Sequence, residues 1–205
     1  MAVTTQDALF DRITEAAQDR DRCLVALAGP PASGKTTLAD TLAARFGDDA
    51  VVLPMDGFHL DNATLHKMGR LHRKGAPDTF DAQGFVDLLT AVREGGNVPY
   101  PTFDRKKDAT VPKGGTIPAA ARIILVEGNY LLLTDSPWSQ LAPLFDLTVR
   151  IDVADNTLKE RLIRRWLKHG LSPEEAEARA TENDMENVAY VRAHSSDPDL
   201  VFQPE

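Results

Sequence analysis

One segment constrains the fold more than any other, the glycine-rich run at residues 29–36, which has the sequence GPPASGKT. It fits the pattern G-x-x-x-x-G-K-[ST] and stands between an apolar run at residues 23–28 and a helix-forming stretch at residues 35–46. Glycines let the backbone turn tightly and aim successive N–H groups at a phosphate chain, and the following helix adds the positive end of its dipole. We therefore predict a strand, a phosphate-binding loop (P-loop) and a helix in succession, with a nucleoside triphosphate as the ligand.

Two side chains of this loop have separate chemical tasks. Lys35 supplies a mobile cation for the terminal phosphates, and the Thr36 hydroxyl is placed to ligate Mg²⁺. The alternative is a glycine-rich turn with an exposed lysine, and the strand–loop–helix context argues against it. The chain has no N-K-x-D motif for guanine recognition, so the expected cofactors are ATP and Mg²⁺. The predicted nucleotide contacts in the loop are Gly29, Ala32, Ser33, Gly34, Lys35, Thr36 and Thr37.

The rest of the chain alternates between short apolar runs and helical patterns. Fully apolar strands that alternate with helices indicate a parallel sheet covered on both faces. We therefore predict an α/β, three-layer P-loop NTPase fold in a single domain over residues 1–205, with a central, mostly parallel sheet and a helical lid at about residues 155–172. Residues 56–121 are rich in Gly and Pro and carry one predicted helix. The predicted strands cover residues 23–28, 50–55, 122–127, 145–152 and 200–202. The predicted helices cover residues 4–17, 35–46, 81–94, 155–169 and 173–190.

Composition excludes several classes of function. The 205 residues carry a net charge of −8, which argues against a general binder of nucleic acid, because such a protein needs excess positive charge. A single cysteine, Cys23, rules out an internal disulfide framework and a cysteine-based zinc site. No apolar stretch approaches the roughly 20 residues that span a membrane. We expect a cytoplasmic protein whose partners are ATP and a small molecule, with no nucleic acid and no membrane insertion.

Two acidic residues follow predicted strands. Asp56 comes after the strand at residues 50–55, and the carboxyl ends of neighbouring parallel strands share one crevice, so Asp56 is expected beside the P-loop. There it could accept a proton from a substrate hydroxyl, or it could only cap a helix or close a turn. Glu127 ends the apolar strand at residues 122–127 and is expected to face the same crevice. It either helps to hold Mg²⁺ or is an acid that happens to end a strand.

A basic face follows from the spacing within residues 158–168. Arg161, Arg164, Arg165 and Lys168 fall at i, i+3, i+4 and i+7 and therefore share one side of a helix. One interpretation is a lid whose arginines contact ATP and stabilise the charge of the transferring phosphate, with Arg161 and Arg165 catalytic and Arg161 and Arg164 binding the nucleotide. The other is a solvated surface helix that pairs with nearby glutamates.

Five motifs in this order carry a resemblance to a known family. After the P-loop come MDGFH, RKGAPDTFD, YPTFDR, LVEGNYLLL and RLIRRWLKHG. From about residue 23 to residue 168, the chain resembles the uridine kinase, phosphoribulokinase and pantothenate kinase group. The whole set is similar to bacterial uridine kinase-like proteins labelled as fructose transport system kinases. The resemblance implies transfer of the γ-phosphate of ATP to an alcohol group of a sugar, a nucleoside or a pantothenate-like acceptor.

The resemblance also implies roles for individual residues. Asp56 matches the proposed catalytic base, and His59 stands where uridine kinases carry an aromatic residue that contacts the acceptor. Asp81 matches an aspartate that holds acceptor hydroxyls, although it could equally be the N-cap of the helix that follows. Glu127 matches the glutamate that helps to hold Mg²⁺. The predicted acceptor contacts in the YPTFDR motif are Tyr100, Phe103, Asp104 and Arg105.

Two features of the sequence leave alternatives open. His59 and residues 183–187 depart from the uridine kinase pattern, and the amides of the second segment either contact a base or acceptor or lie on the surface.

The group often forms dimers, so a homodimer is one expectation for this chain. The rival hypothesis is a regulatory module in which bound ATP controls a protein partner. The motifs expected to form an acceptor pocket favour the kinase.

Overall fold

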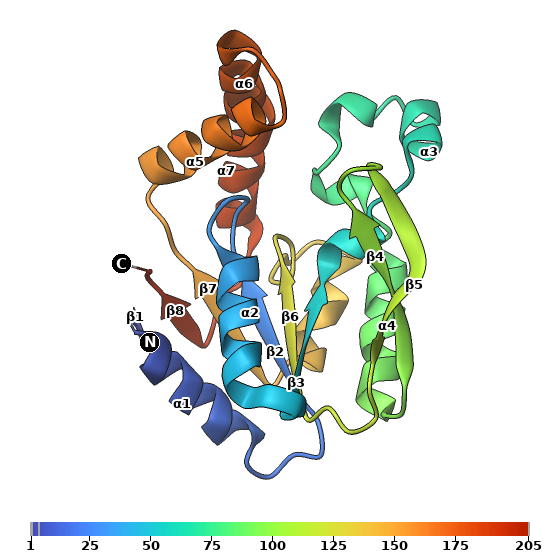
Figure 1. Ribbon diagram of the computed structural model, residues 1–205, viewed down its shortest axis with the longest axis vertical. Coiled ribbons are helices and arrows are strands. Elements are labelled where there is room, and N and C mark those ends of the chain that lie inside the picture. The colour runs from blue at the N-terminus through green and yellow to red at the C-terminus, as the bar shows by residue number, and fades with distance from the viewer. Residues whose placement is uncertain (1, 4, 205) are drawn as a thin grey trace.

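A six-stranded sheet forms the centre of the computed structural model, which describes residues 2–3 and 5–204 (Figure 1). Its strand order is β1-β8-β7-β2-β6-β3, and every pair of neighbours is parallel. The parallel sheet with helices on both faces confirms the predicted fold class. The strands are β1 (Ala2–Val3), β2 (Cys23–Ala28), β3 (Ala50–Pro54), β6 (Ile123–Gly128), β7 (Leu147–Ile151) and β8 (Leu200–Phe202).

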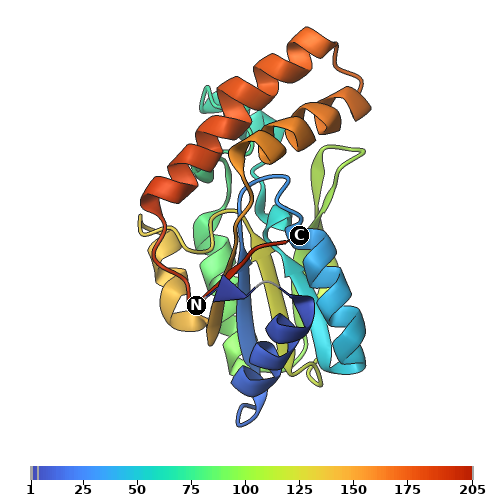
Figure 2. The same cartoon turned by 90° about the vertical axis from the view of Figure 1, so that its left-hand side faces the viewer.

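The sheet separates two hydrophobic cores, because successive side chains of a strand point to opposite faces. In β2, Leu24 and Ala26 pack into the core beneath α4 (Ala82–Glu94), whereas Val25 and Leu27 pack into the core beneath α1 (Gln6–Ala17) and α2 (Lys35–Phe46). Figures 1 and 2 show α1 and α2 on one side of the sheet and α4 on the other. Burial on both faces explains why the strands are apolar throughout.

Local sequence sets where the helices begin. The Thr5 side chain accepts from Ala8 N at the start of α1, and Asp81 accepts from Gly84 N at the start of α4. Thr4, the predicted start of the first helix, lies outside the described residues. Gly34, at the N-terminus of α2, has φ 95°, a left-handed conformation that glycine adopts without strain. The P-loop can therefore turn directly into the helix.

Strand order corrects one sequence-based expectation. β3 was expected to neighbour β2, but β6 lies between them and pairs with both. Glu127, at the end of β6, consequently stands between the P-loop and the segment that follows β3. Asp56 lies in that segment, in a 3₁₀-helix over Met55–Phe58.

The segment at residues 56–121 contains more structure than the single helix that its sequence predicted. It forms a short helix, α3 (Asn62–Lys67), and an antiparallel hairpin of β4 (Val98–Asp104) and β5 (Ala109–Ile117) that is separate from the main sheet. The hairpin packs closely on the turn that follows β3, since a Cβ on Gly57 would lie 1.9 Å from the backbone oxygen of Pro101. A larger residue at position 57 would push the hairpin away from the sheet.

The helices α5 (Asp155–Lys168), α6 (Pro173–Arg179) and α7 (Met185–His194) project beyond the sheet, and we call these three helices the lid (Figure 2). The lid predicted at about residues 155–172 covers only α5 and the turn after it, and its role stays a prediction. Residues 173–190 were expected to form one helix, but a π-helix over Ala180–Asp184 interrupts them. Such bulges displace the following residues around the helix axis and often occur at functional sites. Here the polar side chains Asn183, Asp184 and Asn187 are buried. No helix among the described residues has the length and apolar character needed to cross a membrane.

Candidate active site

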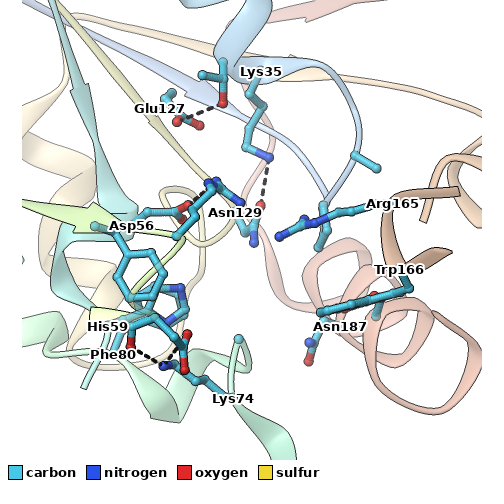
Figure 3. Close-up of a pocket in the computed structure, with 18 of the residues that line it drawn as sticks. Lys35, Asp56, His59, Lys74, Phe80, Glu127, Asn129, Arg165, Trp166 and Asn187 are labelled. Carbon is cyan, nitrogen blue, oxygen red and sulfur yellow. Dashed lines mark hydrogen bonds and ion pairs between the residues drawn. The ribbon is translucent and has the colours of Figure 1, made fainter. Parts of the chain in front are cut away.

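A cavity of about 700 Å³ lies at the carboxyl edge of the sheet, between the P-loop, the β4–β5 hairpin and the lid. Figure 3 shows that its side chains form two ends. We call the part beside Lys35 and Glu127 the nucleotide end, and the part beside His59, Phe80 and Lys74 the acceptor end. The P-loop residues that line it are Pro31, Ala32, Gly34, Lys35 and Thr36, and the next residue, Thr37, lines it as well.

Lys35 is buried at the nucleotide end and is held by two oxygen atoms. Its Nζ donates to the backbone oxygen of Pro30 at 3.0 Å and to Oδ1 of Asn129 at 2.8 Å. Burial lowers the pKa of this ammonium group, and the carboxylates of Glu127 and Asp56 oppose that effect. Asn129 stands between Lys35 and Arg165 (Figure 3), so its amide oxygen orients the Lys35 ammonium group.

Thr36 and Glu127 form a pair of hard oxygen ligands. The Thr36 hydroxyl donates to Oε1 of Glu127 at 3.1 Å, and only 6% of Glu127 is exposed. Burial raises the pKa of this carboxyl group, whereas the charge of Lys35 lowers it. Magnesium ions prefer such oxygens and take most of their remaining ligands from water and phosphate, so the pair fits a Mg²⁺ site. The described residues contain no cluster of three or more His, Cys, Asp or Glu side chains that could hold a metal by themselves.

Asp56 lies across the cavity from Lys35 and pairs with Arg105. The guanidinium of Arg105, just beyond β4, donates to Oδ2 of Asp56 at 2.6 Å. Both side chains line the cavity. The structure therefore places the predicted base and one predicted acceptor contact together, with the carboxylate about one-third exposed and accessible from the cavity.

Aromatic rings form one wall of the acceptor end. The His59 ring stacks on Phe80 with centroids 4.0 Å apart and lies 4.8 Å from the ring of Phe103. Burial lowers the pKa of His59 to about 4, so its imidazole is neutral at pH 7. Lys74 and Asp108 lie beside this wall and also line the cavity. His59 and Phe103, both predicted acceptor contacts, are thus brought together.

The lid contributes the opposite side of the cavity. Arg161 donates to the backbone oxygen of Ala32 in the P-loop at 3.3 Å, and Arg165 points toward Asn129 (Figure 3). Arg164 is exposed and is not among the lining residues. Trp166 also lines the cavity, and its Nε1 donates to Oδ2 of Asp184 at 2.6 Å. Of the three predicted lid arginines, Arg165 alone lines the cavity, and Arg161 contacts the P-loop from outside that lining.

The π-helix determines where the side chains of residues 183–187 lie. Asp184 and Asn187 are buried and line the cavity. Burial raises the pKa of Asp184, while hydrogen bonding to Trp166 and the charge of Arg165 lower it. Of the two alternatives drawn from the sequence, the structure favours a segment that faces the site.

Other predicted site residues lie outside the lining of the cavity. Asp81 caps α4, and the Asp104 carboxylate accepts from the backbone N–H groups of Lys106 and Lys107 in the hairpin turn. Tyr100 is buried and donates from its hydroxyl to Val52 O at 3.4 Å. Gly29 and Ser33 lie within the P-loop, where a Cβ on Gly29 would approach Ser33 Oγ to 2.8 Å. The predicted direct contacts of these five residues stay predictions.

Sequence reasoning missed several residues that line the cavity. Asn129 stands two residues after the predicted magnesium glutamate in the motif LVEGNYLLL, and that position was the available signal. Lys74 lies in the motif RKGAPDTFD, but the sequence alone predicted no role for it. Trp166 and Arg179 lie within predicted helices, and their sequence context gave neither of them a role. Only the lid geometry brings these two side chains to the site.

Comparison with known proteins places the chain among kinases. The model of the Phosphoribulokinase / Uridine kinase family matches residues 24–204. A Schizosaccharomyces pombe protein named "Putative uridine kinase" is 35% identical over 214 residues, which cover 98% of this chain and 91% of that protein. The pantothenate kinase of Mycolicibacterium gilvum is 30% identical over 181 residues, which cover 82% of this chain and 58% of that enzyme.

A solved structure has the same architecture over nearly the whole chain. The crystal structure of a "putative fructose transport system kinase" from Silicibacter sp. TM1040 superposes with a TM-score of 0.92 at 41% identity. The match covers 97% of this chain and 99% of that one.

Proposed function

The chain belongs to the phosphoribulokinase/uridine kinase family, and from this premise we propose that it transfers the γ-phosphate of Mg²⁺-bound ATP to an alcohol group of a small metabolite. Phosphate transfer from ATP to a small molecule is the activity of the family. The metal, the residue roles and the nature of the acceptor are the proposed parts.

One observation carries the proposal: a single cavity joins a phosphate-binding end to a separate acceptor end, with Asp56 between them. A regulatory module that responds only to bound ATP needs the first end alone. The aromatic wall and the polar lid residues of the second end are therefore best explained by an acceptor molecule.

The proposed mechanism relies on positioning and charge stabilisation. Lys35 and Arg165 neutralise charge that develops on the transferring phosphoryl group. Asp56 accepts the proton of the attacking hydroxyl once the acceptor takes the place of Arg105 beside it. Thr36 and Glu127 would hold Mg²⁺ on the side of the phosphates. When bound, the ion would neutralise part of the negative charge of the nucleotide.

The acceptor is proposed to be a sugar, a nucleoside or a pantothenate-like alcohol. The name of the Silicibacter protein puts fructose in this set, and the names of the two relatives add uridine and pantothenate. Localisation in the cytoplasm and assembly into a homodimer stay predictions from the sequence.

The test begins with ATP turnover in the presence of fructose, uridine and pantothenate, measured as ADP release and as phosphorylated product by mass spectrometry. In Asp56→Asn we expect kcat with the productive acceptor to fall by about 10²- to 10⁴-fold, because the amide cannot take up the proton. ATP affinity, measured by titration calorimetry, should change by less than about threefold, since Asp56 does not bind the phosphates.

Asp61→Asn provides a matched control for this test. Asp61 caps α3 on the same segment, accepts from Thr64 N at 2.8 Å and lies outside the cavity lining. Asparagine caps a helix about as well as aspartate, so this variant should keep wild-type kinetics. Retention of most activity by Asp56→Asn would show that another group accepts the proton.

A further inference from the structure

The lysine at the acceptor end already has all three of its ammonium protons engaged. Lys74 Nζ lies 2.7 Å from Oδ1 of Asn62, 2.8 Å from Oδ1 of Asp108 and 3.3 Å from the backbone oxygen of Asp108. Only 13% of the side chain is exposed. Asn62 in turn donates to the other carboxylate oxygen of Asp108 at 2.8 Å. The charge of Lys74 is therefore neutralised before any acceptor arrives.

The arginines at this end are also occupied. Arg105 pairs with Asp56, and Arg179 donates to the backbone oxygens of His72 and Lys74 at 2.8 and 3.2 Å. The guanidinium of Arg179 lies 5.3 Å from the centre of the Trp166 ring, which forms its other contact. Arg179 therefore presents no unused cationic fork to a ligand at the acceptor end, whereas Arg105 uses one nitrogen on Asp56 and about half of its side chain is exposed.

Arg165 is the remaining cation of the lid that lines the cavity. Burial is the main cause of the lowered pKa of Lys35, and repulsion by Arg165 lowers that pKa further. The charge of Arg165 therefore lies at the nucleotide end, where ATP brings negative charge. The carboxylates that act on Arg165 itself are those of Asp184 and Asp56. The charge of Arg165 is thus available for phosphates and is shared with two acids of the protein.

Uncharged hydrogen-bonding groups, by contrast, remain unsaturated at the acceptor end. His59 Nδ1 is buried and has no hydrogen-bond partner among the described residues. Asn187 receives only a long contact of 3.4 Å from Arg73 among the described residues, so its amide can still bond to a ligand. Beside them lie the rings of Phe80 and Phe103. Such a surface suits a molecule with hydroxyl groups and a flat or apolar face.

We propose that the phosphate acceptor is an uncharged polyhydroxy compound, a sugar or a nucleoside, and that the Lys74–Asp108 pair excludes acceptors with a carboxylate or phosphate group. The inference rests on the proposed function, which it narrows. An anionic acceptor would have to lie beside the Asp108 carboxylate or separate it from Lys74, and a partly buried charge left without its partner is strongly unfavourable. A neutral hydroxyl compound meets no such penalty.

Matched pairs of compounds test the inference in the wild-type chain. Each pair contains a neutral alcohol and its charged counterpart: pantothenol and pantothenate, ribose and ribose 5-phosphate, glycerol and glycerate. Binding is measured by calorimetry with a non-hydrolysable ATP analogue present, and transfer is measured separately by mass spectrometry with ATP. In every pair that binds, we expect the neutral member to bind at least about tenfold more tightly. Tighter binding of the charged member overturns the inference.

The Asp108→Asn variant tests the cause of the preference. It leaves the charge of Lys74 without its carboxylate, so the preference for the neutral member should fall by about tenfold in the same binding assay. Asp78→Asn is the matched control, because it breaks a comparable pair with Arg70, at 2.7 Å, outside the cavity lining. An unchanged preference in Asp108→Asn, or an equal loss in both variants, contradicts the inference.

The two assays separate this inference from the proposed function. Selective binding of neutral compounds without phosphate transfer would support the inference and refute the kinase assignment of Asp56. Transfer to the charged member of a pair, with Asp56 essential, would do the reverse.

Discussion

At the scale of single residues, His59 couples the acceptor end to the stability of the fold. Its ring is buried between Phe80 and Phe103, which holds its pKa at about 4 against an ordinary value near 6.5. The charges that face it are those of Asp56, Lys74, Asp108 and Arg105. The pair of aspartates raises the pKa of the imidazole and the two cations lower it, so burial decides the direction of the shift.

This shift predicts a pH dependence of stability. Between about pH 6.5 and pH 4 the unfolded chain binds a proton that native His59 does not, so the stability contributed by neutral His59 is present above pH 6.5 and is lost as pH falls through this window. In urea unfolding, wild type should lose about 2 kcal/mol more than His59→Gln between pH 7 and pH 4. Other titrating groups are common to both proteins and cancel in the difference. Parallel stability curves for the two proteins would refute the assignment.

Local chemistry determined which site residues could be predicted from the sequence. Lys35, Thr36 and Glu127 are specified by short patterns and by their place after apolar strands, so their proximity could be expected. Asn129 had only its place in the motif LVEGNYLLL as a signal, and Arg179 had none, because their contacts with Lys35 and with His72 join segments far apart in the chain. Asp81 could be read as a cap or as a site residue, and only the position of the cavity distinguishes the two roles.

At the scale of elements, the lid and the segment at residues 72–75 each contribute an arginine that donates hydrogen bonds to the other. Arg73 donates to the backbone oxygen of Glu182 at 3.0 Å and to the Glu186 carboxylate at 2.6 Å. Arg179 donates in the opposite direction, to the backbone of residues 72 and 74. The hydroxyl of Tyr130 also bonds to the backbone oxygen of Gly75. This reciprocal clasp fixes the lid beside the acceptor end.

The clasp predicts that lid attachment controls acceptor binding. Replacing both arginines (Arg73→Gln with Arg179→Gln) should raise the acceptor KM about fivefold and speed hydrogen exchange at residues 72–75 and 180–187, because five hydrogen bonds between the elements are lost. Mass spectrometry of deuterated peptides measures the exchange. Lys159→Gln is the control, since it removes a lid-internal pair with Glu177 and leaves the clasp intact. Unaltered exchange at both segments would show that the clasp does not hold the lid.

The sequence predicted the boundaries of three elements correctly. The limits of β2, α2 and β8 match the prediction, because an unbroken apolar run or a glycine at each end defines them. The β4–β5 hairpin was missed because its prolines, glycines and charges hide the alternation of a strand, and much of β5 is exposed. The π-helix was missed for a different reason. Its extra residue is favoured by tertiary contacts of Asp184 with Trp166 and has no local sequence signal.

At the scale of the whole molecule, the two edges of the sheet serve different purposes. The carboxyl edge bears the cavity. At the opposite edge, Arg22, which directly precedes β2, links the neighbouring segments by hydrogen bonds. Its buried guanidinium donates to the backbone oxygens of five residues at the end of α4 and in the loops around β4 and β6. These acceptors are Val92, Gly96, Pro118, Ala119 and Ala121, at 2.8 to 3.4 Å.

This division predicts that stability and activity respond to different substitutions. Arg22→Met should lower the free energy of unfolding by about 3 kcal/mol, because several buried carbonyl groups lose their donor at once. Urea denaturation measures that loss. The kcat and the KM for ATP, both measured at a temperature 20 °C lower than the variant's Tm, should stay within about twofold of wild type. Arg12→Met, which breaks only an exposed pair with Glu15, should cost less than about 0.5 kcal/mol. A large fall in kcat for Arg22→Met under these conditions would mean that the two edges are coupled through β2, and that the cavity depends on packing at the far end of the sheet.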